Sequence, residues 1–286
     1  IPATIVTGFL GSGKTTLLRK LLTNAQGRRI AVIVNEFGEL GIDGELLRGC
    51  GIGCDENGEE NGQLFELANG CLCCTVQEEF APVMEQLAAR RDQIDYLVIE
   101  TSGLALPQPL IRAFNWPEIK AEVTIDGVVT VADAAALAEG RFANDEAAVD
   151  ALRSADDMLD HETPLGELFE DQLVAADLVI LNKADLVAEA DLDTVERHLR
   201  AEMRPGTGLV RAHNGHVDVA ALLGLGLASE DNLAGRDSHH ELEHGGEAHE
   251  HDDFDSFAVR LDAGPGKDAL MAAIEATIRT HDVLRM

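Results

Sequence analysis

The segment Gly8–Thr15 has the residue types and spacing of a phosphate-binding loop, with glycines around the turn followed by lysine and threonine. Glycines let the backbone curl until several N–H groups point at one phosphate, while the Lys14 ammonium reaches the outer phosphates and the Thr15 hydroxyl can ligate Mg²⁺. An apolar run, Ala3–Thr7, precedes the loop and a helical pattern follows it, which argues against a chance glycine-rich turn. The loop therefore predicts a bound nucleoside triphosphate. The predicted contacts are Gly11, Ser12, Gly13, Lys14, Thr15 and Thr16.

A second motif, Asn182-Lys183-Ala184-Asp185, comes directly after an apolar run and bears on the choice of base. An aspartate accepts two hydrogen bonds from the guanine N1–H and exocyclic amine, whereas adenine presents no matching pair of donors. The alternative is that the asparagine or the aspartate caps the following helix. Because the same chain has a complete phosphate loop, we expect GTP, with its base read by Asn182, Lys183 and Asp185.

An acidic residue, Glu100, ends the apolar run Tyr96–Ile99, where a nucleotide-binding α/β fold places an acid that organises magnesium. Glu100 can hold a magnesium-bound water or position the attacking water, and the Gly103 N–H can sense the terminal phosphate; a merely solvated acid is the alternative. Lys14 and Glu100 are the predicted catalytic residues, and Thr15 and Glu100 serve Mg²⁺. Since the sequence identifies no catalytic arginine or glutamine, we expect hydrolysis slower than about 1 s⁻¹ without a partner.

The five cysteines of the chain lie between Cys50 and Cys74, at spacings too tight for a set of disulfides. In an extended segment Cys71 and Cys73 face one side while Cys74 points away, so two thiolates can share one ion. Zinc, cobalt and copper(I) prefer such ligands. Packing in a core and a redox disulfide are the alternatives. Three cysteines within four residues favour a transition-metal site at Cys71, Cys73 and Cys74.

The sequence determines the other metal ligands less well. Glu36 offers a carboxylate on a loop that can also meet the nucleotide, in which case metal affinity and nucleotide state are reciprocally coupled. Cys50 and Cys54 are either further ligands or solvated thiols, and His213 and His216 either back the base or lie on the surface. A histidine-rich stretch either captures metal weakly or is only a linker. Its histidines are His239, His240, His244, His249 and His251.

Apolar runs rich in valine and isoleucine alternate with helical patterns along most of the chain. This rhythm predicts an α/β fold of the P-loop NTPase class, a mostly parallel sheet with helices on both faces. The segment Pro107–Pro109 predicts a loop. The predicted strands are Ala3–Thr7, Ala31–Val34, Leu64–Leu67, Tyr96–Ile99, Val128–Val131, Leu178–Leu181 and Gly208–Arg211. The predicted helices are Thr15–Leu22, Glu79–Ala89, Gly166–Ala175 and Asp191–Met203.

Two stretches interrupt this rhythm. Glycine and acid dominate Gly38–Asn69, which predicts a mobile loop, and acid and histidine dominate Ser229–Asp255, which predicts a disordered tether. Beyond it, Ser256–Asp262 reads as a strand and Lys267–Thr280 as a helix, a small α+β segment too short to fold alone. The predicted divisions are a nucleotide-binding domain over 1–228, a linker over 229–255 and the start of a truncated C-terminal domain over 256–286.

Composition limits the classes of partner. The 286 residues, 45% of them hydrophobic, can bury one main core. The net charge of −30, from 52 acidic and 22 basic residues, repels nucleic acid and anionic lipid. The sequence shows neither an apolar run of about 18 residues nor a charged-then-apolar leader. We therefore expect no nucleic-acid or membrane partner and a cytoplasmic location.

Taken in order, five motifs resemble those of the CobW family of metallochaperone GTPases, which are related to the GTPases that insert nickel into urease and hydrogenase. These motifs are Gly8–Thr15, Asn35-Glu36-Phe37-Gly38, Cys71-Leu72-Cys73-Cys74, Glu100-Thr101-Ser102-Gly103 and Asn182-Lys183-Ala184-Asp185. The resemblance covers about Pro2–Leu227, whereas Ser256–Met286 resembles only the opening strand and helix of the family's C-terminal domain. It implies a magnesium-dependent GTPase that binds a transition metal with GTP and releases it on hydrolysis.

The resemblance also implies a particular metal. The insertion that carries Cys50 and Cys54 is more similar to the cobalamin-biosynthesis branch of the family than to its zinc-associated branch. Cobalt(II) is therefore the expected cargo, and a chelatase that inserts cobalt into the corrin ring is the expected acceptor. The alternatives are a zinc chaperone with the same mechanism, a metal buffer with a regulatory nucleotide site, and an ATP-dependent kinase of a small metabolite.

Overall fold

A computed structural model describes residues 1–35, 62–67, 80–143, 145, 148–149, 164–233 and 235–239. The chain divides into two compact units, Ile1–Glu243 and His244–Met286. All described residues belong to the first unit. The predicted C-terminal segment over 256–286 and most of the predicted loop Gly38–Asn69 lie outside them.

Seven strands in the described part of the chain form one sheet in the order β3-β2-β4-β1-β5-β6-β7. Every neighbouring pair is parallel. The strands are β1 (Pro2–Thr7), β2 (Ile30–Asn35), β3 (Gly62–Leu67), β4 (Tyr96–Glu100), β5 (Thr124–Asp133), β6 (Leu178–Asn182) and β7 (Gly208–Arg211). Each of them contains or coincides with a predicted strand, so the predicted α/β class is confirmed.

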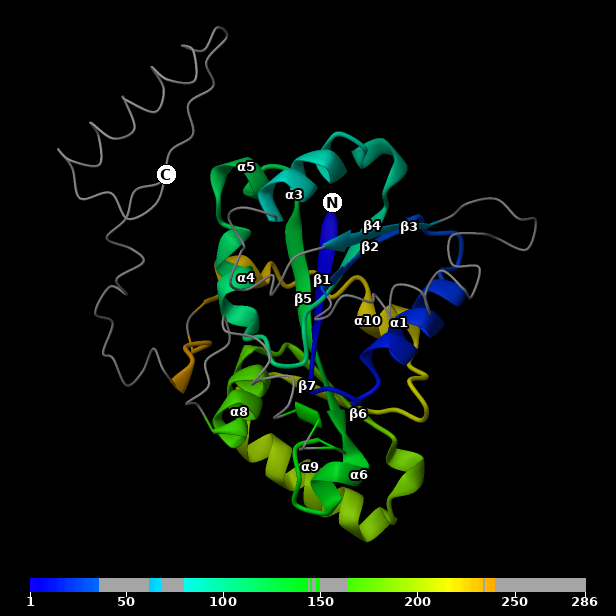
Figure 1. Ribbon diagram of the computed structural model, residues 1–286, viewed down its shortest axis with the longest axis vertical. Coiled ribbons are helices and arrows are strands. Elements are labelled where there is room, and N and C mark those ends of the chain that lie inside the picture. Colours follow the sequence, from blue (N-terminus) through cyan, green and yellow to red (C-terminus); the bar gives the residue numbers. More distant parts are fainter. Residues whose placement is uncertain are drawn as a thin grey trace, which may run out of the picture. The chain divides into compact units, whose positions relative to one another are not determined.

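Helices cover both faces of this sheet, and Figure 1 shows α1 and α10 on one side with α4 and α8 on the other. The α-helices are α1 (Lys14–Thr23), α3 (Ala81–Ala88), α4 (Pro107–Ala113), α5 (Pro117–Lys120), α6 (Ala134–Ala138), α8 (Leu165–Ala175), α9 (Glu189–Glu202) and α10 (Val219–Leu222). Three single 3₁₀ turns are η2 (Arg91–Gln93), η3 (Ala184–Leu186) and η4 (Ser229–Asp231). None of the helices in the described ranges is both long and apolar enough to cross a membrane.

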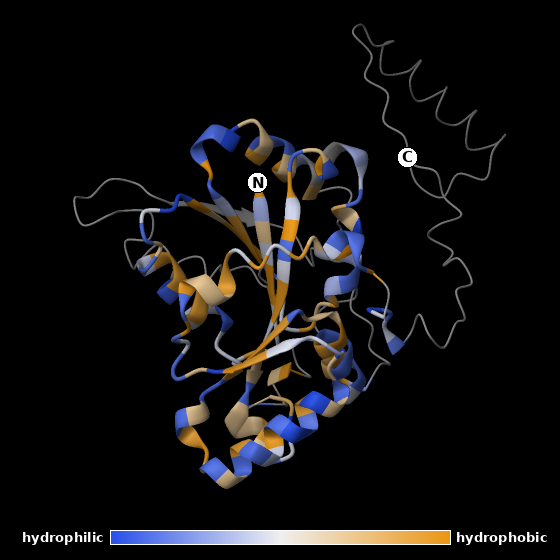
Figure 2. Ribbon diagram, turned by 180° about the vertical axis from the view of Figure 1, so that it is seen from behind, coloured by the Kyte–Doolittle hydropathy of each residue, from blue (hydrophilic) through white to orange (hydrophobic). Residues whose placement is uncertain are grey.

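The alternation of side chains along each strand sends apolar residues to both faces of the sheet, where the buried residues of the described ranges form three clusters. In β1, Ile5 packs with α3 and α4, whereas the next residue, Val6, packs with Leu17 and Leu18 of α1 on the opposite face. Because both faces are covered, the strands are apolar along most of their length, as Figure 2 shows in orange. Burying one such side chain contributes about 1.5–3 kcal/mol. The sheet is therefore a rigid support for the loops at its ends.

The helices α4 and α6 have no counterpart among the predicted helices. The segment Pro107–Pro109, predicted as a loop, begins α4, because proline at the first helical position has the right φ and needs no N–H partner. The helix α6 follows β5 directly, and Asp133 caps it by accepting hydrogen bonds from Ala135 N at 3.0 Å and Ala136 N at 3.2 Å. Proline marks both turns and helix starts, which explains the wrong prediction at α4.

The predicted tether does not begin at Ser229. Glu230 is 4% exposed and accepts hydrogen bonds from Thr124 Oγ1 at 2.5 Å and Ile125 N at 2.9 Å, at the start of β5. Arg236 is 2% exposed and pairs with Asp177 at 2.6 Å. Ser229, Glu230, Arg236 and Ser238 are buried, so the residues immediately after 228 are not the disordered tether that their composition predicted. Acid-rich composition suggested disorder here, but these side chains have specific partners in the sheet.

Candidate nucleotide site

The carboxyl ends of the strands bring the predicted motifs together. The register of β1 with β4 pairs Val6 with Glu100, so the phosphate loop leaves β1 beside the predicted magnesium acid. The register of β5 with β6 pairs Asp133 with Asn182, the first residue of the predicted base-reading motif. Open parallel sheets hold ligands at this edge.

Two glycines of the phosphate loop are required by its geometry. Gly8 has φ +134° and Gly13 has φ +104°, values that L side chains rarely adopt. A Cβ at Gly8 would overlap the carbonyl oxygen of Val131, and a Cβ at Gly13 would overlap the amide of Asn182. The loop is therefore curled tightly against β5 and against the base-reading motif.

Lys14 begins α1 and is 7% exposed. Its Nζ donates to Gly8 O at 2.7 Å and to Phe9 O at 3.3 Å, and Ser12 N donates to Phe9 O at 3.1 Å. The N-cap residue, Gly13, provides no side-chain hydrogen bond to the first turn of α1. The exposed backbone N–H groups and the positive end of the helix dipole make this place favourable for an anion.

Three buried hydroxyl groups beside the loop have no hydrogen-bond partner among the described residues, those of Thr7, Ser12 and Thr101. Buried hydroxyls usually have one, so the arrangement suits a ligand that brings oxygen atoms. Glu100, 3% exposed, ends β4 next to Thr101, and Thr15 lies in the first turn of α1. Hydroxyl and carboxylate oxygens are the ligands that Mg²⁺ prefers, so the residues present fit this ion.

Asn182 joins the phosphate loop to the base side of the site. It is 2% exposed, its Nδ2 donates to Ser12 O at 2.8 Å, and its Oδ1 accepts from Gly215 N at 2.8 Å. The next residue, Lys183, adopts the left-handed conformation with φ 59°, and its Nζ lies 2.5 Å from the buried Asp133 carboxylate. These contacts fix the positions of Asn182 and Lys183.

Asp185 has an accessible carboxyl group, with the side chain 46% exposed. The N-cap of η3 is Lys183 and the N-cap of α9 is Ala188, and neither side chain makes a capping hydrogen bond. Neither Asn182 nor Asp185 therefore caps a helix, and the capping alternative is wrong. His213 Nδ1 lies 3.7 Å from Asp185 Oδ1. The turn that carries His213 closes with a hydrogen bond from the His216 N–H to the His213 carbonyl at 3.0 Å, and both histidines are exposed.

The loop after β4 lies between the phosphate loop and α8. A Cβ added to Gly103 would lie 2.7 Å from Leu10 N, so only glycine allows this approach. The Gly103 carbonyl accepts a hydrogen bond from Gln172 Nε2 at 3.2 Å, and the same amide reaches Ala105 O at 3.2 Å. Gln172 is fully buried. Sequence reasoning missed it because a polar residue in an amphipathic helix carries no local signal beyond its position on the apolar face.

The predicted metal ligands, Glu36, Cys71, Cys73 and Cys74, lie outside the described residues. Cys50, Cys54 and the histidines from His240 onward also lie outside them. The strands that lead to the predicted ligands are described. β2 ends at Asn35, the residue before Glu36. Asn35 pairs in register with Leu67 of β3, which lies four residues before Cys71. Within the described ranges, no group of three or more His, Cys, Asp and Glu side chains could hold a metal.

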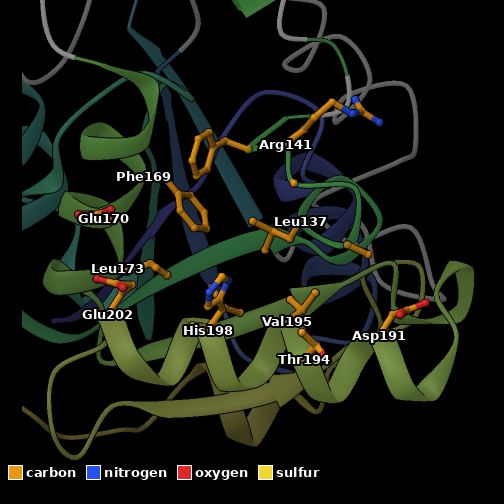
Figure 3. A pocket seen from close by; sticks show the side chains of 14 residues that line it. Leu137, Arg141, Phe169, Glu170, Leu173, Asp191, Thr194, Val195, His198 and Glu202 are labelled. Atoms are coloured by element: carbon orange, nitrogen blue, oxygen red, sulfur yellow. The ribbon is translucent and has the colours of Figure 1, made fainter.

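A separate cavity of about 360 Å³ lies between α8, α9 and the segment 137–142 (Figure 3). The rings of Phe142 and Phe169, 5.5 Å apart, line it together with Val195 and His198 of α9. It is lined by no residue of the phosphate loop or of the base-reading motif. This cavity is therefore distinct from the candidate nucleotide site.

A parallel sheet with a phosphate loop between β1 and α1 and a guanine-type motif after β6 defines a P-loop GTPase. Comparison with known families agrees with this class. Residues 2–210 match the nucleotide-binding domain described as CobW/HypB/UreG, and the chain belongs to this family of GTPases.

Individual relatives cover most or all of the chain. A protein of Sinorhizobium sp, named zinc chaperone CobW, is 54% identical over 288 residues, spanning 100% of this chain and 80% of its own. The zinc chaperone CobW of Pseudomonas aeruginosa is 56% identical over 286 residues, spanning 100% of this chain and 76% of its own. The zinc chaperone YjiA of Escherichia coli is 33% identical over 239 residues, spanning 82% of this chain and 64% of its own.

A solved structure supports the fold. The Zn(II)-bound triple mutant of the YjiA GTPase superposes with a TM-score of 0.50 at 24% identity, covering 79% of this chain and 62% of that one. The predicted GTPase and the resemblance to the CobW family are thus confirmed. The relatives are named for zinc, and the cobalt expectation stays a prediction.

Proposed function

We propose that this GTPase is a metallochaperone that binds a divalent transition metal together with Mg²⁺ and GTP and releases it to a protein acceptor after hydrolysis to GDP and phosphate. One observation carries the proposal. The strands β2 and β3, which lead into the predicted metal ligands, are neighbours in the sheet whose carboxyl edge carries the phosphate loop.

The nucleotide half of the proposal assigns a role to each motif at this edge. Lys14 and the N-terminus of α1 hold the phosphates, where the curl of the loop already surrounds the ammonium. Asp185 accepts the guanine hydrogen bonds through its accessible carboxylate, and Asn182 and Lys183 keep the motif in place. A site built for two such bonds rejects adenine because its polar groups would lose their partners.

The hydrolytic step of the nucleotide half concerns Mg²⁺ and water. Thr15 and Glu100 are the residues that would hold Mg²⁺, which neutralises charge on the phosphates when bound. Glu100 ends a fully buried strand, so its carboxylate has a fixed position from which to orient a water molecule. Gly103, beside the phosphate loop, supplies the backbone N–H that senses the terminal phosphate. We expect slow turnover without an acceptor protein.

The metal half rests on chain length and strand spacing. Adjacent strands lie about 4.8 Å apart, and only β4 separates β2 from β1, so the ends of β2 and β1 are about 10 Å apart. Glu36 is one residue beyond β2, and Cys71 is four residues beyond β3, a span of at most about 14 Å. The same loops can therefore reach both the thiolates and the terminal phosphate. Coupling between metal and nucleotide follows by linkage.

Zinc is the cargo that we propose first, because the two relatives above half identity bear the name of zinc chaperone. Cobalt(II) remains the second candidate, favoured by the insertion with Cys50 and Cys54. Two or three thiolates and a carboxylate suit both ions. With cobalt as cargo, the cobalt chelatase of corrin synthesis is the proposed acceptor.

The test is a comparison of metal affinities in three nucleotide states. Zn(II) and Co(II) are titrated against a chromophoric chelator with the full chain, in the presence of a non-hydrolysable GTP analogue, of GDP, or of neither. We expect tight binding only with the triphosphate, and the preferred ion is the one whose affinity rises most. Equal affinity in all three states would contradict the chaperone and favour a metal buffer.

Two substitutions separate the halves of the mechanism. Cys73→Ala removes a thiolate and should abolish tight metal binding while GTP affinity changes little. Lys14→Ala should weaken GTP binding and remove the nucleotide-dependent gain in metal affinity, while the basal affinity persists. Loss of GTP affinity with the cysteine variant alone would mean that the thiols build the fold. Preference for ATP over GTP in the same titrations would favour a kinase.

A further inference from the structure

The base-reading motif places a cation and an anion close together in the chain. Lys183 lies two residues before Asp185, so their Cα atoms are at most about 7 Å apart. The flexible four-carbon stem of lysine can bridge such a distance. An ion pair between the two side chains would occupy the carboxylate oxygens that are assigned to guanine. The position of the Lys183 ammonium therefore matters for recognition of the base.

The Lys183 ammonium pairs with a different carboxylate. Its Nζ lies 2.5 Å from Oδ2 of Asp133, the last residue of β5. The Asp133 side chain is 2% exposed, whereas the Asp185 side chain is 46% exposed. Opposite charges attract more strongly where water is excluded, so the buried carboxylate is the stronger partner for the ammonium. Within the described residues, Asp185 keeps only His213, 3.7 Å away, as an ion-pair partner.

Asp133 divides its two oxygen atoms between two tasks. Oδ1 accepts hydrogen bonds from Ala135 N at 3.0 Å and Ala136 N at 3.2 Å and so caps α6, while Oδ2 faces the Lys183 ammonium. Because asparagine and aspartate cap helices about equally well, Asp133→Asn keeps an oxygen atom for the cap. The amide nitrogen would then face the ammonium, with a donor against a donor. This substitution therefore keeps the helix cap and displaces the lysine.

The backbone of the base-reading motif is held without the help of the ammonium. The Asn182 side-chain amide makes two hydrogen bonds of 2.8 Å. The Ala184 N–H donates to Ala212 O at 3.1 Å, and the Leu186 N–H donates to Lys183 O at 3.0 Å. The ion pair with the carboxylate of β5 therefore fixes the side chain of Lys183 more than the path of the chain.

We propose that Asp133 is a positioning residue for guanine recognition, which sequesters the Lys183 ammonium and so keeps the Asp185 carboxylate open to the base. The inference rests on the proposed function, since it takes Asp185 as the guanine acceptor. Asp133 acts through the lysine and contacts neither the base nor the phosphates in this role. When the Asp133 carboxylate is removed, the ammonium pairs with Asp185 and competes with guanine.

The test is the affinity of Asp133→Asn for a non-hydrolysable GTP analogue, measured in the full chain with Mg²⁺ by competition with a fluorescent guanine nucleotide. The competing ion pair is exposed, and such pairs stabilise by up to about fivefold, so we expect the affinity to fall by about fivefold. Removal of a negative charge would by itself favour binding of the polyanionic nucleotide, so this loss has the opposite sign to a general charge effect. Unchanged or tighter binding would overturn the proposal.

A second substitution separates sequestration from a structural role. In Asp133→Asn combined with Lys183→Gln the competing ammonium is gone, and the net charge equals that of the parent chain. We expect the affinity for the GTP analogue to recover almost fully. A merely structural ion pair predicts no recovery, because the double variant lacks the pair as well. A double variant that binds as weakly as Asp133→Asn would therefore overturn the proposal.

Asp218→Asn is the matched control, because Asp218 caps α10 by accepting from Ala220 N at 2.9 Å and has no lysine partner within the described part of the chain. It should leave the affinity for the GTP analogue unchanged. Steady-state hydrolysis should show the loss in Asp133→Asn as a raised KM with little change in kcat, since the phosphate loop is unaltered. Asp133→Ser provides a second variant if Asp133→Asn does not fold, because serine also caps helices and has no carboxylate.

Asp185→Asn in the same assay distinguishes this inference from the proposed function. If this variant keeps the affinity of the parent chain, guanine reading by Asp185 is refuted. In the Asp185→Asn background, Asp133→Asn should weaken binding no further, since the ammonium has no carboxylate left to occupy. The same loss in both backgrounds would refute only the sequestration.

Discussion

Acidic residues at the two edges of the sheet differ in how many hydrogen-bond donors of the chain they contact. At the amino edge, Asp126 accepts hydrogen bonds from three successive backbone N–H groups, those of Gly224, Leu225 and Gly226, at 2.5–2.8 Å, and from the Tyr96 hydroxyl. At the carboxyl edge, Asp185 has a half-exposed carboxylate whose nearest ion-pair partner is His213, 3.7 Å away. The chain itself satisfies Asp126, whereas Asp185 offers its carboxylate to a ligand.

Asp177 shows how complete the amino edge is. It accepts hydrogen bonds from Val128 N at 3.0 Å and Ser229 Oγ at 2.6 Å, and pairs with Arg204 at 3.1 Å and Arg236 at 2.6 Å. Burial acts to raise the pKa of Asp177, but the hydrogen bonds from Ser229 and Arg236 outweigh it and leave the pKa below its ordinary value. An acid with this many donors stabilises the fold.

The comparison teaches that burial of polar groups alone does not identify a site. Both edges bury charged or hydroxyl side chains, and only at the carboxyl edge do Thr7, Ser12 and Thr101 keep hydroxyls without partners in the described residues. Unsatisfied groups cost stability, so their concentration beside the phosphate loop is evidence for a ligand. Substitutions at the amino edge should change stability, and substitutions at the carboxyl edge should change binding.

The largest expected effect is on stability. Asp177→Asn removes the charge that two arginines share, one of them only 2% exposed, and should lower the free energy of unfolding. Breaking a buried ion pair by removing one partner costs about 3–5 kcal/mol. Chemical denaturation measures this change. Asp231→Asn is the control, because its pair with Lys120 is exposed and such pairs contribute at most about 1 kcal/mol. Similar losses in the two variants would break the comparison.

Lys14→Ala should produce the largest loss at the carboxyl edge. The ammonium is held inside the phosphate loop, and removal of such a preorganised donor lowers turnover by about 10²–10³-fold. Steady-state GTP hydrolysis and calorimetry measure the effect, with Lys20→Ala of the same helix as the control. The unfolding free energy should change much less than in Asp177→Asn. A variant that unfolds instead would assign Lys14 a structural role.

Asp185→Asn should change the preference for the base. An asparagine amide cannot accept both guanine donors, so GTP affinity should fall by about 100-fold. Xanthosine triphosphate, which carries an oxygen in place of the exocyclic amine, should bind better to the variant than GTP does. Competition with a fluorescent nucleotide measures both. Unchanged GTP affinity would show that another residue reads guanine.

The smallest expected effect tests an exposed acid at the amino edge. The hydrogen bond from Arg29 lowers the pKa of Asp95 to about 2 from 3.8. Because this folded-state pKa is depressed, the stabilisation is complete above pH 3.8 and is lost as the pH falls through 2. Arg29→Gln should return the pKa toward 3.8 in an NMR titration, with little change in stability at pH 7, because both side chains are more than 40% exposed. Arg91→Gln should leave the Asp95 titration as it is.

The fold was largely predictable from the sequence because its signals are local. Each strand is a short apolar run, and the phosphate loop and the base motif are continuous segments next to strands. The packing of Ser229 against Asp177 was not predictable, because the two are 52 residues apart and nothing in either neighbourhood marks the other. Composition alone suggested a tether there.

The candidate site was predictable only in part, because some of its contacts join residues that are far apart in the sequence. Lys14, Glu100 and Asp185 belong to recognisable motifs, and the strand ends bring those motifs to one edge. Gln172 was missed because its two acceptors lie 69 and 67 residues away and are backbone carbonyls, which leave no trace in the sequence. Residues that position a loop through the backbone are harder to find than residues that belong to a continuous motif.

Asn182 gives the site an unusual mechanical property. One amide group holds Ser12 of the phosphate loop with its nitrogen and Gly215 of the 213–216 turn with its oxygen. Displacement of that surface turn therefore pulls on the loop around the phosphates, through a single side chain.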